Sequence, residues 1–302
     1  MEKRFQIVTD SSCDLPQALA DELDLAVLPL HVLIGEHTYA NYLDGREIGF
    51  KEFYDKLRNG ERATTSAVNV SEFTAVMEEK LKAGLDILFI GFSSGLSTTY
   101  QSGAIACGEL REKYPERKLV VIDSLCSSSG YGLLVDGAAD LRDAGKSMDE
   151  IADWTMAMRQ NVHHQFYSTE LKFYRRSGRM SGAAAAIGTV LGICPIMRLD
   201  DKGRIIAYDK VRGKKNAVAR TVETMKRHAQ GGVDYAGKAF ICHSNCLSDA
   251  LATKAAVEAA FPHLDGEVRI CDIGTIVASH SGPGTVAVFF FGDARAPEGD
   301  PV

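Results

Sequence analysis

The sequence predicts an α/β protein of two domains, the first with a mostly parallel sheet and the second with added antiparallel strands. Its 302 residues are about twice the ~150 residues of a typical domain. In the first half, short apolar runs alternate with amphipathic segments, which is the pattern of βαβ units. In the second half, strands follow one another more closely, and residues 200–203 (DDKG) have the chemistry of a hairpin turn.

The first half predicts strands and helices in turn. Residues 5–10 (FQIVTD) form an apolar strand, and a helix over 15–23 has Pro16 near its start. Apolar side chains at positions 73, 76, 77 and 81 recur at helical spacing, which predicts a helix over 72–82. The remaining elements expected in this half are an apolar run at 26–34, strands at 86–92 and 119–123, and helices at 97–113 and 148–159.

The second half predicts an α/β domain with an antiparallel addition. Two strands, at 196–198 and 205–211, flank the 200–203 turn. The other elements expected here are strands at 165–173, 238–243, 267–271 and 285–291 and a helix at 249–261. We place the boundary after the 148–159 helix, which gives an N-terminal domain of residues 1–160 and a C-terminal domain of residues 161–302.

Composition excludes several classes of protein. Hydrophobic residues make up 45% and charged residues 25%, which excludes a disordered chain and a small disulfide scaffold. The net charge of −6 argues against nucleic-acid binding through an overall positive charge of the protein. Seven scattered cysteines predict free thiols and a cytoplasmic location. The uncharged stretch 180–197 contains Pro195 and many small residues, so we expect a buried helix and a strand rather than a membrane span.

Basic residues are concentrated in one segment. Residues 170–227 hold 14 Lys and Arg against five Asp and Glu, a net charge of +9, while the rest of the chain has a net charge of −15. Two explanations fit such a segment equally well. The basic residues lie on solvated helix and hairpin faces, or they form a patch that docks an acidic partner. The candidate docking residues are Arg175, Arg176, Arg179 and Arg204.

Hydroxyl side chains gather where several predicted strands end. Clusters occur at 11–12, 64–66, 93–99 and 124–129. Ligands of open α/β sheets bind beyond the carboxyl ends of the strands, and helix N-termini there favour anions. Helix capping alone explains any one cluster. Several clusters at neighbouring strand ends favour a site for an anion or a polar headgroup.

Residues 91–95 (GFSSG) match the G-x-S-x-G pattern of a nucleophile elbow. Asp272 and His280 follow Ser93 in the order of the hydrolase triad, so a serine hydrolase or esterase is the alternative function. No oxyanion-hole motif of the HGGG type precedes Ser93, and the Asp and His lie only eight residues apart, which disfavours this alternative.

Metal and nucleotide sites lack sequence support. Cys242, His243 and Cys246 have no second ligand pair at zinc-site spacing, so no metal is expected there. No Walker A loop and no G-x-G-x-x-G after a strand are present. His280 precedes the last strand in a Gly- and Pro-rich segment that predicts a tight loop.

An ordered set of motifs across nearly the whole chain resembles the DegV family of bacterial fatty-acid-binding proteins. The opening IVTDSS at 7–12 and the closing HSGPG at 280–284 frame this set. The motifs between them are ATTS at 63–66, GLSTTYQS at 95–102, DS at 123–124, GYG at 130–132, LKF at 171–173, SGR at 177–179 and PI at 195–196.

The resemblance implies one long-chain fatty acid, such as palmitate or stearate, bound between the two domains by a protein that is not itself an enzyme. Family members present the fatty acid to a kinase catalytic subunit, which phosphorylates the carboxylate. By motif match, Thr65 and Ser97 hold the carboxylate and His280 belongs to the same network. Further headgroup candidates are Ser66, Thr98 and Ser124. No cofactor, no metal and no nucleic acid are expected.

This chain departs from the family pattern at three places. Ala67-Val68 replaces Gln-Pro after the Thr-Ser pair, Thr98 replaces a Gly, and Cys194 replaces a Lys before the Pro-Ile pair. The expected headgroup hydroxyls are all present.

Overall fold

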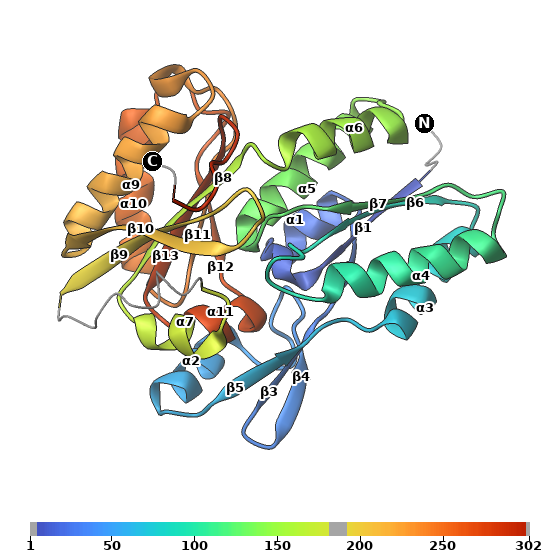
Figure 1. Ribbon diagram of the computed structural model, residues 1–302, viewed down its shortest axis with the longest axis horizontal. Helices are drawn as coiled ribbons and strands as arrows, with labels where there is room; N and C mark the ends of the chain where they lie inside the picture. The colour runs from blue at the N-terminus through green and yellow to red at the C-terminus, as the bar shows by residue number, and fades with distance from the viewer. Residues whose placement is uncertain (1–4, 181–191, 300–302) are drawn as a thin grey trace.

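The computed structural model describes residues 5–180 and 192–299. It contains two α/β bodies that lie side by side (Figure 1). The strands of the parallel sheet all precede residue 160, and those of the six-stranded sheet all follow it. The predicted two-domain α/β class is therefore confirmed, and we propose residue 160 as the boundary between the domains.

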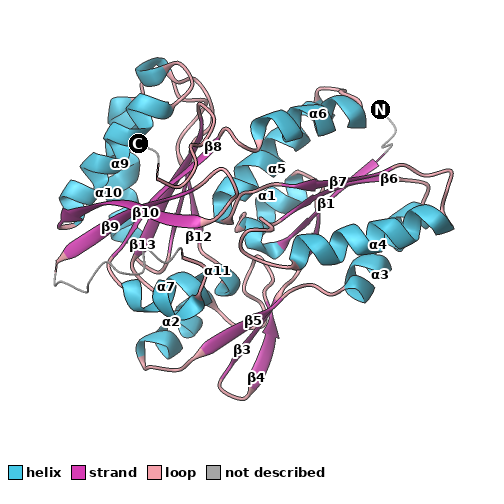
Figure 2. Ribbon diagram, viewed as in Figure 1, coloured by secondary structure: helices cyan, strands magenta, loops and turns pink. Residues whose placement is uncertain are grey.

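The first body is built on a four-stranded parallel sheet in the order β2-β1-β6-β7. Helices cover both faces of this sheet, as Figure 2 shows. Asn69 and Glu72 form a capping box that starts α3, and Ser147 and Glu150 do the same for α6. The elements are β1 (Phe5–Asp10), α1 (Gln17–Glu22), β2 (Ala26–Leu28), α3 (Val70–Lys82), β6 (Asp86–Gly91), α4 (Thr99–Lys113), β7 (Leu119–Asp123), α5 (Ser128–Asp143) and α6 (Met148–Met158), with a 3₁₀ turn at Ser11–Cys13.

The sequence analysis missed a second sheet in the first half. The single apolar run expected at 26–34 is two strands in two different sheets, β2 and β3 (His31–Ile34). Pro29 and Leu30 separate them, and proline removes the main-chain donor that a continuous strand would need. β3 pairs antiparallel with β4 (His37–Ala40) and with β5 (Ala63–Ser66). Between β4 and β5 lies α2 (Phe50–Arg58).

The second body is built on a six-stranded mixed sheet in the order β10-β9-β8-β13-β11-β12. Its neighbours are antiparallel except for β11 and β12. The elements are β8 (Val162–Ser168), α7 (Leu171–Ser177), β9 (Ile193–Leu199), β10 (Ile205–Arg212), α9 (Lys214–His228), β11 (Phe240–His243), α10 (Leu247–Ala260), β12 (Arg269–Asp272), α11 (Thr275–Ser281) and β13 (Thr285–Phe291), with a 3₁₀ turn at Gly232–Asp234.

Two expectations for the second body were wrong. The strand expected at 165–173 ends at Ser168, and α7 follows it. His280 lies on α11 rather than in a loop. The helix expected at the start of 180–197 falls mainly outside the described residues, whereas the strand that follows it is confirmed as β9.

The core is continuous between the two bodies. α5 packs against β8, β11 and β13 of the second sheet as well as against its own domain. Along β13, Phe289 belongs to this shared core, while Phe290 points into a second core under α9 and α10. None of the helices in the described ranges combines the length and the apolar character that a bilayer crossing requires.

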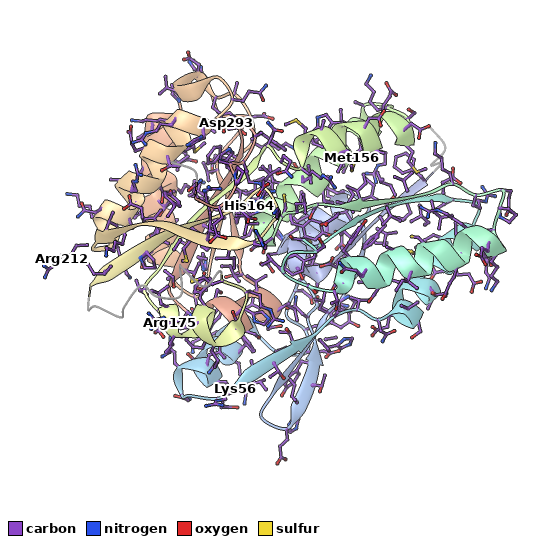
Figure 3. The ribbon with its side chains drawn as sticks, in the orientation of Figure 1. Lys56, Met156, His164, Arg175, Arg212 and Asp293 are labelled. Atoms are coloured by element: carbon purple, nitrogen blue, oxygen red, sulfur yellow. The ribbon has the colours of Figure 1, made fainter. Side chains whose placement is uncertain are left out.

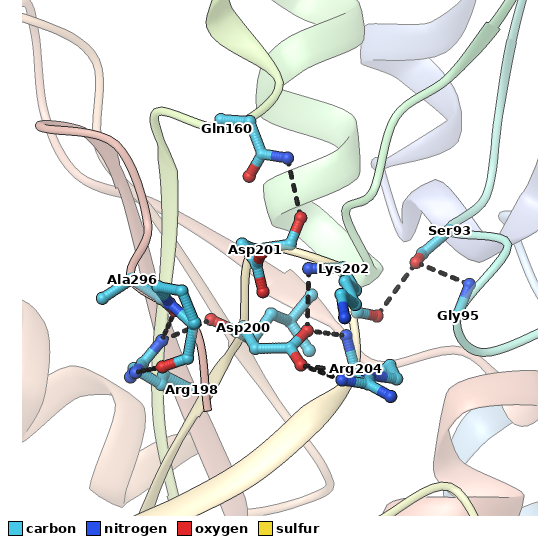
Figure 4. Close-up of polar contacts among 12 residues, drawn as sticks. Ser93, Gly95, Gln160, Arg198, Asp200, Asp201, Lys202, Arg204 and Ala296 are labelled. Carbon is cyan, nitrogen blue, oxygen red and sulfur yellow. Dashed lines mark hydrogen bonds and ion pairs between the residues drawn. The ribbon is translucent and has the colours of Figure 1, made fainter. Parts of the chain in front are cut away.

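The β9–β10 hairpin also joins the two bodies. The hydroxyl of Ser93 donates to the main-chain oxygen of Gly203 (2.9 Å), and the amide of Gln160 donates to that of Asp201 (2.7 Å), as Figure 4 shows. Within the turn, Asp200 is buried and accepts from the guanidinium of Arg204 at 3.0 and 3.1 Å. The hairpin tip is therefore held at the carboxyl end of the parallel sheet.

Candidate functional site

A cavity of about 500 Å³ lies between the two bodies. It is lined by β5, the loop after β6, the end of α7, the start of β10 and α11. Its volume is within the range of ligand pockets. The lining residues with a bearing on ligand binding are Thr65, Ser66, Ser97, Thr98, Arg179, Arg204, Ile205, Val277 and His280.

The polar side of this cavity is formed by residues that are far apart in sequence. Thr65 Oγ1 lies 2.9 Å from His280 Nε2, although 215 residues separate them. Ser97 also lines the cavity, and its Oγ accepts from the main-chain N–H of Thr99 (3.2 Å) and lies 2.9 Å from that residue's hydroxyl. The structure therefore brings the three predicted carboxylate-binding residues to one cavity.

The position of α11, which carries His280, is fixed by the first domain. The N–H of Gly274 donates to the Asp14 carboxylate (3.0 Å), and the N–H of Thr275 donates to the amide oxygen of Asn41 (2.9 Å). The hydroxyl of Thr275 donates to the same oxygen (2.8 Å). Acceptors from the other domain thus satisfy the donors at the start of the helix. His280 is thereby held about one and a half turns further along, beside β5.

The environment of His280 keeps its imidazole neutral. Burial lowers its pKa, and the positive charges of Arg179 and Arg176 lower it further, to about 4. Arg179 also lines the cavity. A neutral ring beside a cationic guanidinium suits an anionic ligand, because the arginine supplies charge and the ring supplies a hydrogen bond.

A smaller apolar cavity of about 60 Å³ adjoins this one. Four residues line both cavities, namely Ser127, Ile205, Val277 and His280. The inner walls are formed mainly by residues of the second domain that sequence reasoning did not single out, including Phe166, Tyr174, Leu199 and Phe289. Their apolar character was visible in the sequence, but their convergence depends on the register of β8 and β13.

The other predicted residues divide into two groups. Ser66 and Thr98 line the cavity, as do Arg179 and Arg204. Ser124 is outside the lining, and its hydroxyl oxygen accepts from the N–H of Cys126 (3.1 Å) within a turn. The remaining two arginines, Arg175 and Arg176, are exposed on α7.

The geometry does not assemble the serine hydrolase triad. Ser93 is fully buried and donates to the oxygen of Gly203, so its hydroxyl does not reach His280. His280 Nε2 faces Thr65. Asp272 Oδ1 lies 3.7 Å from the ring of His243, on the neighbouring strand. The three residues of the alternative function thus have three separate environments.

Burial raises the pKa of Asp14 to about 7, and the hydrogen bonds from Ser128 and Gly274 offset only part of this effect. Its carboxylate accepts from Ser128 and Gly274. The folded-state pKa exceeds the unfolded value of about 3.9, so this group stabilises the fold fully below about pH 4, and that stabilisation is lost as the pH rises through about 7.

The substitution Asp14→Asn preserves the shape of the side chain and removes the carboxyl group that titrates. We expect the free energy of unfolding of the wild type to fall relative to that of Asp14→Asn between about pH 4 and pH 7. Urea unfolding of both proteins across this range measures the difference in the free energy of unfolding. The contributions of the buried histidines cancel in this difference, because both proteins contain them. A constant difference across the range would contradict the raised pKa.

Comparison with known proteins gives one consistent answer. Residues 4–293 match the model of the family described as "Uncharacterised protein, DegV family". A DegV domain-containing protein of Clostridium perfringens is 37% identical over 295 residues, covering 98% of this chain and all of the relative. A DegV family protein from Thermus thermophilus, described as fatty-acid binding, is 29% identical with a TM-score of 0.86, covering 96% of this chain and all of that one.

A second solved structure agrees with the first. DegV from Bacillus subtilis, described as a fatty acid binding protein, is 26% identical with a TM-score of 0.81, covering 97% of this chain and 100% of that chain. The match of the family model over residues 4–293, together with the relative from C. perfringens, shows that this chain belongs to the DegV family.

Proposed function

We propose that the protein binds a long-chain fatty acid, with its carboxylate held by Thr65 and Ser97 and its tail extending through the larger cavity into the adjoining apolar one. The observation that carries this proposal is the larger cavity, with the Thr65–His280 pair on its polar side, which shares four lining residues with a smaller apolar cavity. The relatives from T. thermophilus and B. subtilis are described as fatty-acid-binding, which supports the same ligand class.

The hydrogen-bond pattern suits a carboxylate. When neutral His280 donates from Nε2 to Thr65 Oγ1, the threonine proton is free to point at the ligand. Ser97 supplies a second hydroxyl, and Arg179 supplies positive charge at the same cavity. A tail of ~15 buried carbons contributes a gross ~12 kcal/mol at ~0.8 kcal/mol each, before binding costs. Binding therefore needs no acid or base catalyst, and we propose a carrier that is not an enzyme.

Mass spectrometry tests the ligand class directly. Protein purified from a bacterial host and denatured in solvent should release a fatty acid of long chain in close to equimolar amount. Native mass spectrometry should show the same adduct on the folded protein. Protein that leaves the host without lipid, and that takes up no palmitate or stearate afterwards, would contradict the proposal.

We further propose that a fatty-acid kinase catalytic subunit docks on the arginines near the cavity and phosphorylates the bound carboxylate. Arg179 and Arg204 line the cavity and are exposed, so this rim is accessible to a partner. Arg175 and Arg176 extend the basic surface along α7. We place this step in the cytoplasm, in keeping with seven free cysteines.

Charge reversal on α7 separates docking from lipid binding. Arg175→Glu should slow phosphorylation by a kinase subunit with ATP, while fatty-acid affinity stays within about threefold, because rim charges set the association rate. The control is Arg212→Glu at the far end of β10; Figure 3 labels Arg175 and Arg212. The defect should shrink at high salt, where the Debye length falls to ~3 Å at 1 M. Normal phosphorylation at low salt would contradict docking here.

A further inference from the structure

A cluster of two histidines and one aspartate lies on the face of the six-stranded sheet away from the ligand cavity. His163 is on β8, His228 ends α9, and Asp293 follows β13. His164, the next residue on β8, lines the inner apolar cavity, so successive side chains of this strand face opposite sides of the sheet. Figure 3 shows His164 near the middle of the molecule and Asp293 above it, in the upper part of the second domain.

We propose that His163, His228 and Asp293 bind one Zn²⁺ ion that ties β8, α9 and the segment after β13 together. Two imidazoles and one carboxylate are a ligand set that zinc accepts, with a fourth position left for water or another oxygen. Among the described residues, this is the group of three or more His, Cys, Asp and Glu side chains whose donor atoms all lie within 4.8 Å of one another.

The distances are close to those a zinc ion needs. Metal–ligand bonds of 2.0–2.2 Å at tetrahedral angles separate two donor atoms by about 3.3 Å. Here Asp293 Oδ1 lies 2.9 Å from His163 Nε2, and Oδ2 lies 3.1 Å from His228 Nδ1. The main-chain oxygen of Asp293 lies 3.0 Å from the same nitrogen of His163 and is a further oxygen donor at this place. The ligand atoms of the three residues all lie within 4.8 Å of one another, so they would draw closer together when the ion binds.

The backbone holds the three side chains in this arrangement before any ion arrives. The N–H of Asp293 donates to the oxygen of His228 (3.0 Å), and that of Gly292 donates to the oxygen of Asn161 (2.8 Å). A Cβ on Gly292 would lie 2.2 Å from the oxygen of His228 and 2.9 Å from the ring of His163, so glycine is what lets the chain approach both. A preformed site loses little conformational entropy on binding.

The cluster is also accessible to a cation. The side chain of Asp293 is 59% exposed, so an ion reaches the cluster from solvent.

Zinc titration of untagged, chelator-treated protein tests the proposal. Calorimetry should show one Zn²⁺ per chain, and zinc should raise the Tm of the wild type, because it binds the folded state preferentially. Asp293→Asn and His228→Ala should each weaken binding at least tenfold and abolish the Tm shift. Two control variants, His263→Ala at an exposed histidine and Cys246→Ser at the one cysteine that is not fully buried, should bind as the wild type does.

Two results would overturn the proposal. One is the absence of stoichiometric binding to the wild type. The other is unchanged affinity in Asp293→Asn, a near-isosteric variant at an exposed position whose fold is checked by circular dichroism. In either case the cluster is a set of hydrogen bonds between three segments. Fatty-acid binding does not enter these measurements, so the zinc site stands or falls independently of the proposed function.

Discussion

Gly282→Val is expected to lower the free energy of unfolding by about 3–5 kcal/mol, because it combines backbone strain with a steric clash. Gly282 ends α11 with φ +67° and ψ −177°, a conformation that is costly for residues with a Cβ. A Cβ there would also lie 2.0 Å from Cδ2 of Phe173, which is 2% exposed. The side chain would have to displace α7 from α11. Urea unfolding measures the loss.

Gly178→Ala is the matched control for backbone strain alone. Gly178 follows α7 with φ +68°, and nothing lies within 4 Å of the position of its Cβ. Its replacement should cost only about 1–2 kcal/mol. Equal losses in the two variants would mean that contact with Phe173 contributes nothing, and that α7 yields readily when α11 presses on it.

Thr65→Val and Ser97→Ala should each weaken fatty-acid binding by about ten- to a hundredfold. Each change removes one hydroxyl from the cavity and preserves most of the side-chain volume. A hydrogen bond to a charged group contributes about 1.5–3 kcal/mol, which corresponds to this loss of affinity. Displacement of a fluorescent fatty acid measures it, and the tail preference should not change, because the apolar wall is untouched.

Thr38→Val controls for the loss of a threonine hydroxyl outside the site. Thr38 is exposed on β4, in the same small sheet as Thr65, and does not line the cavity. This variant should bind as the wild type does. Wild-type affinity in both Thr65→Val and Ser97→Ala, with the fold intact, would remove these residues from the carboxylate site and leave Arg179 and His280 to hold it.

Many elements were predictable from the sequence, but their length did not decide which: the helices α5 and α9, with 16 and 15 residues, were not expected, whereas the five-residue strand β7 was. β1, β7 and β13 have the expected bounds because each is dominated by apolar, β-branched or aromatic residues, which favour strands. β3 was not recognised as a separate strand because Pro29 ends the preceding strand without interrupting the run of apolar residues. The first residues of α7 were predicted as part of a strand because Leu171 and Phe173 alternate with polar residues. In a segment of only seven residues, this pattern does not distinguish a strand from a short helix.

The candidate site was predictable where hydroxyl clusters mark strand ends and not where tertiary contacts decide. Thr65, Ser97 and His280 were chosen by motif and lie at one cavity. Ser124 belongs to the same class of strand-end hydroxyls, but its hydroxyl oxygen accepts a hydrogen bond from Cys126 within the local turn. The His163–His228–Asp293 cluster has no sequence signature, because its members come from three elements that only the sheet and α9 bring together.

The 215-residue separation between Thr65 and His280 has a consequence for biosynthesis. At ~5–20 residues per second, a ribosome that has made Ser97 needs on the order of 10–40 s to reach α11. During that interval, the hydroxyls of the first domain exist without the helix that completes their cavity. We expect nascent and prematurely terminated chains to hold no lipid, so that the cell's fatty acids are captured only by molecules whose synthesis has run past α11.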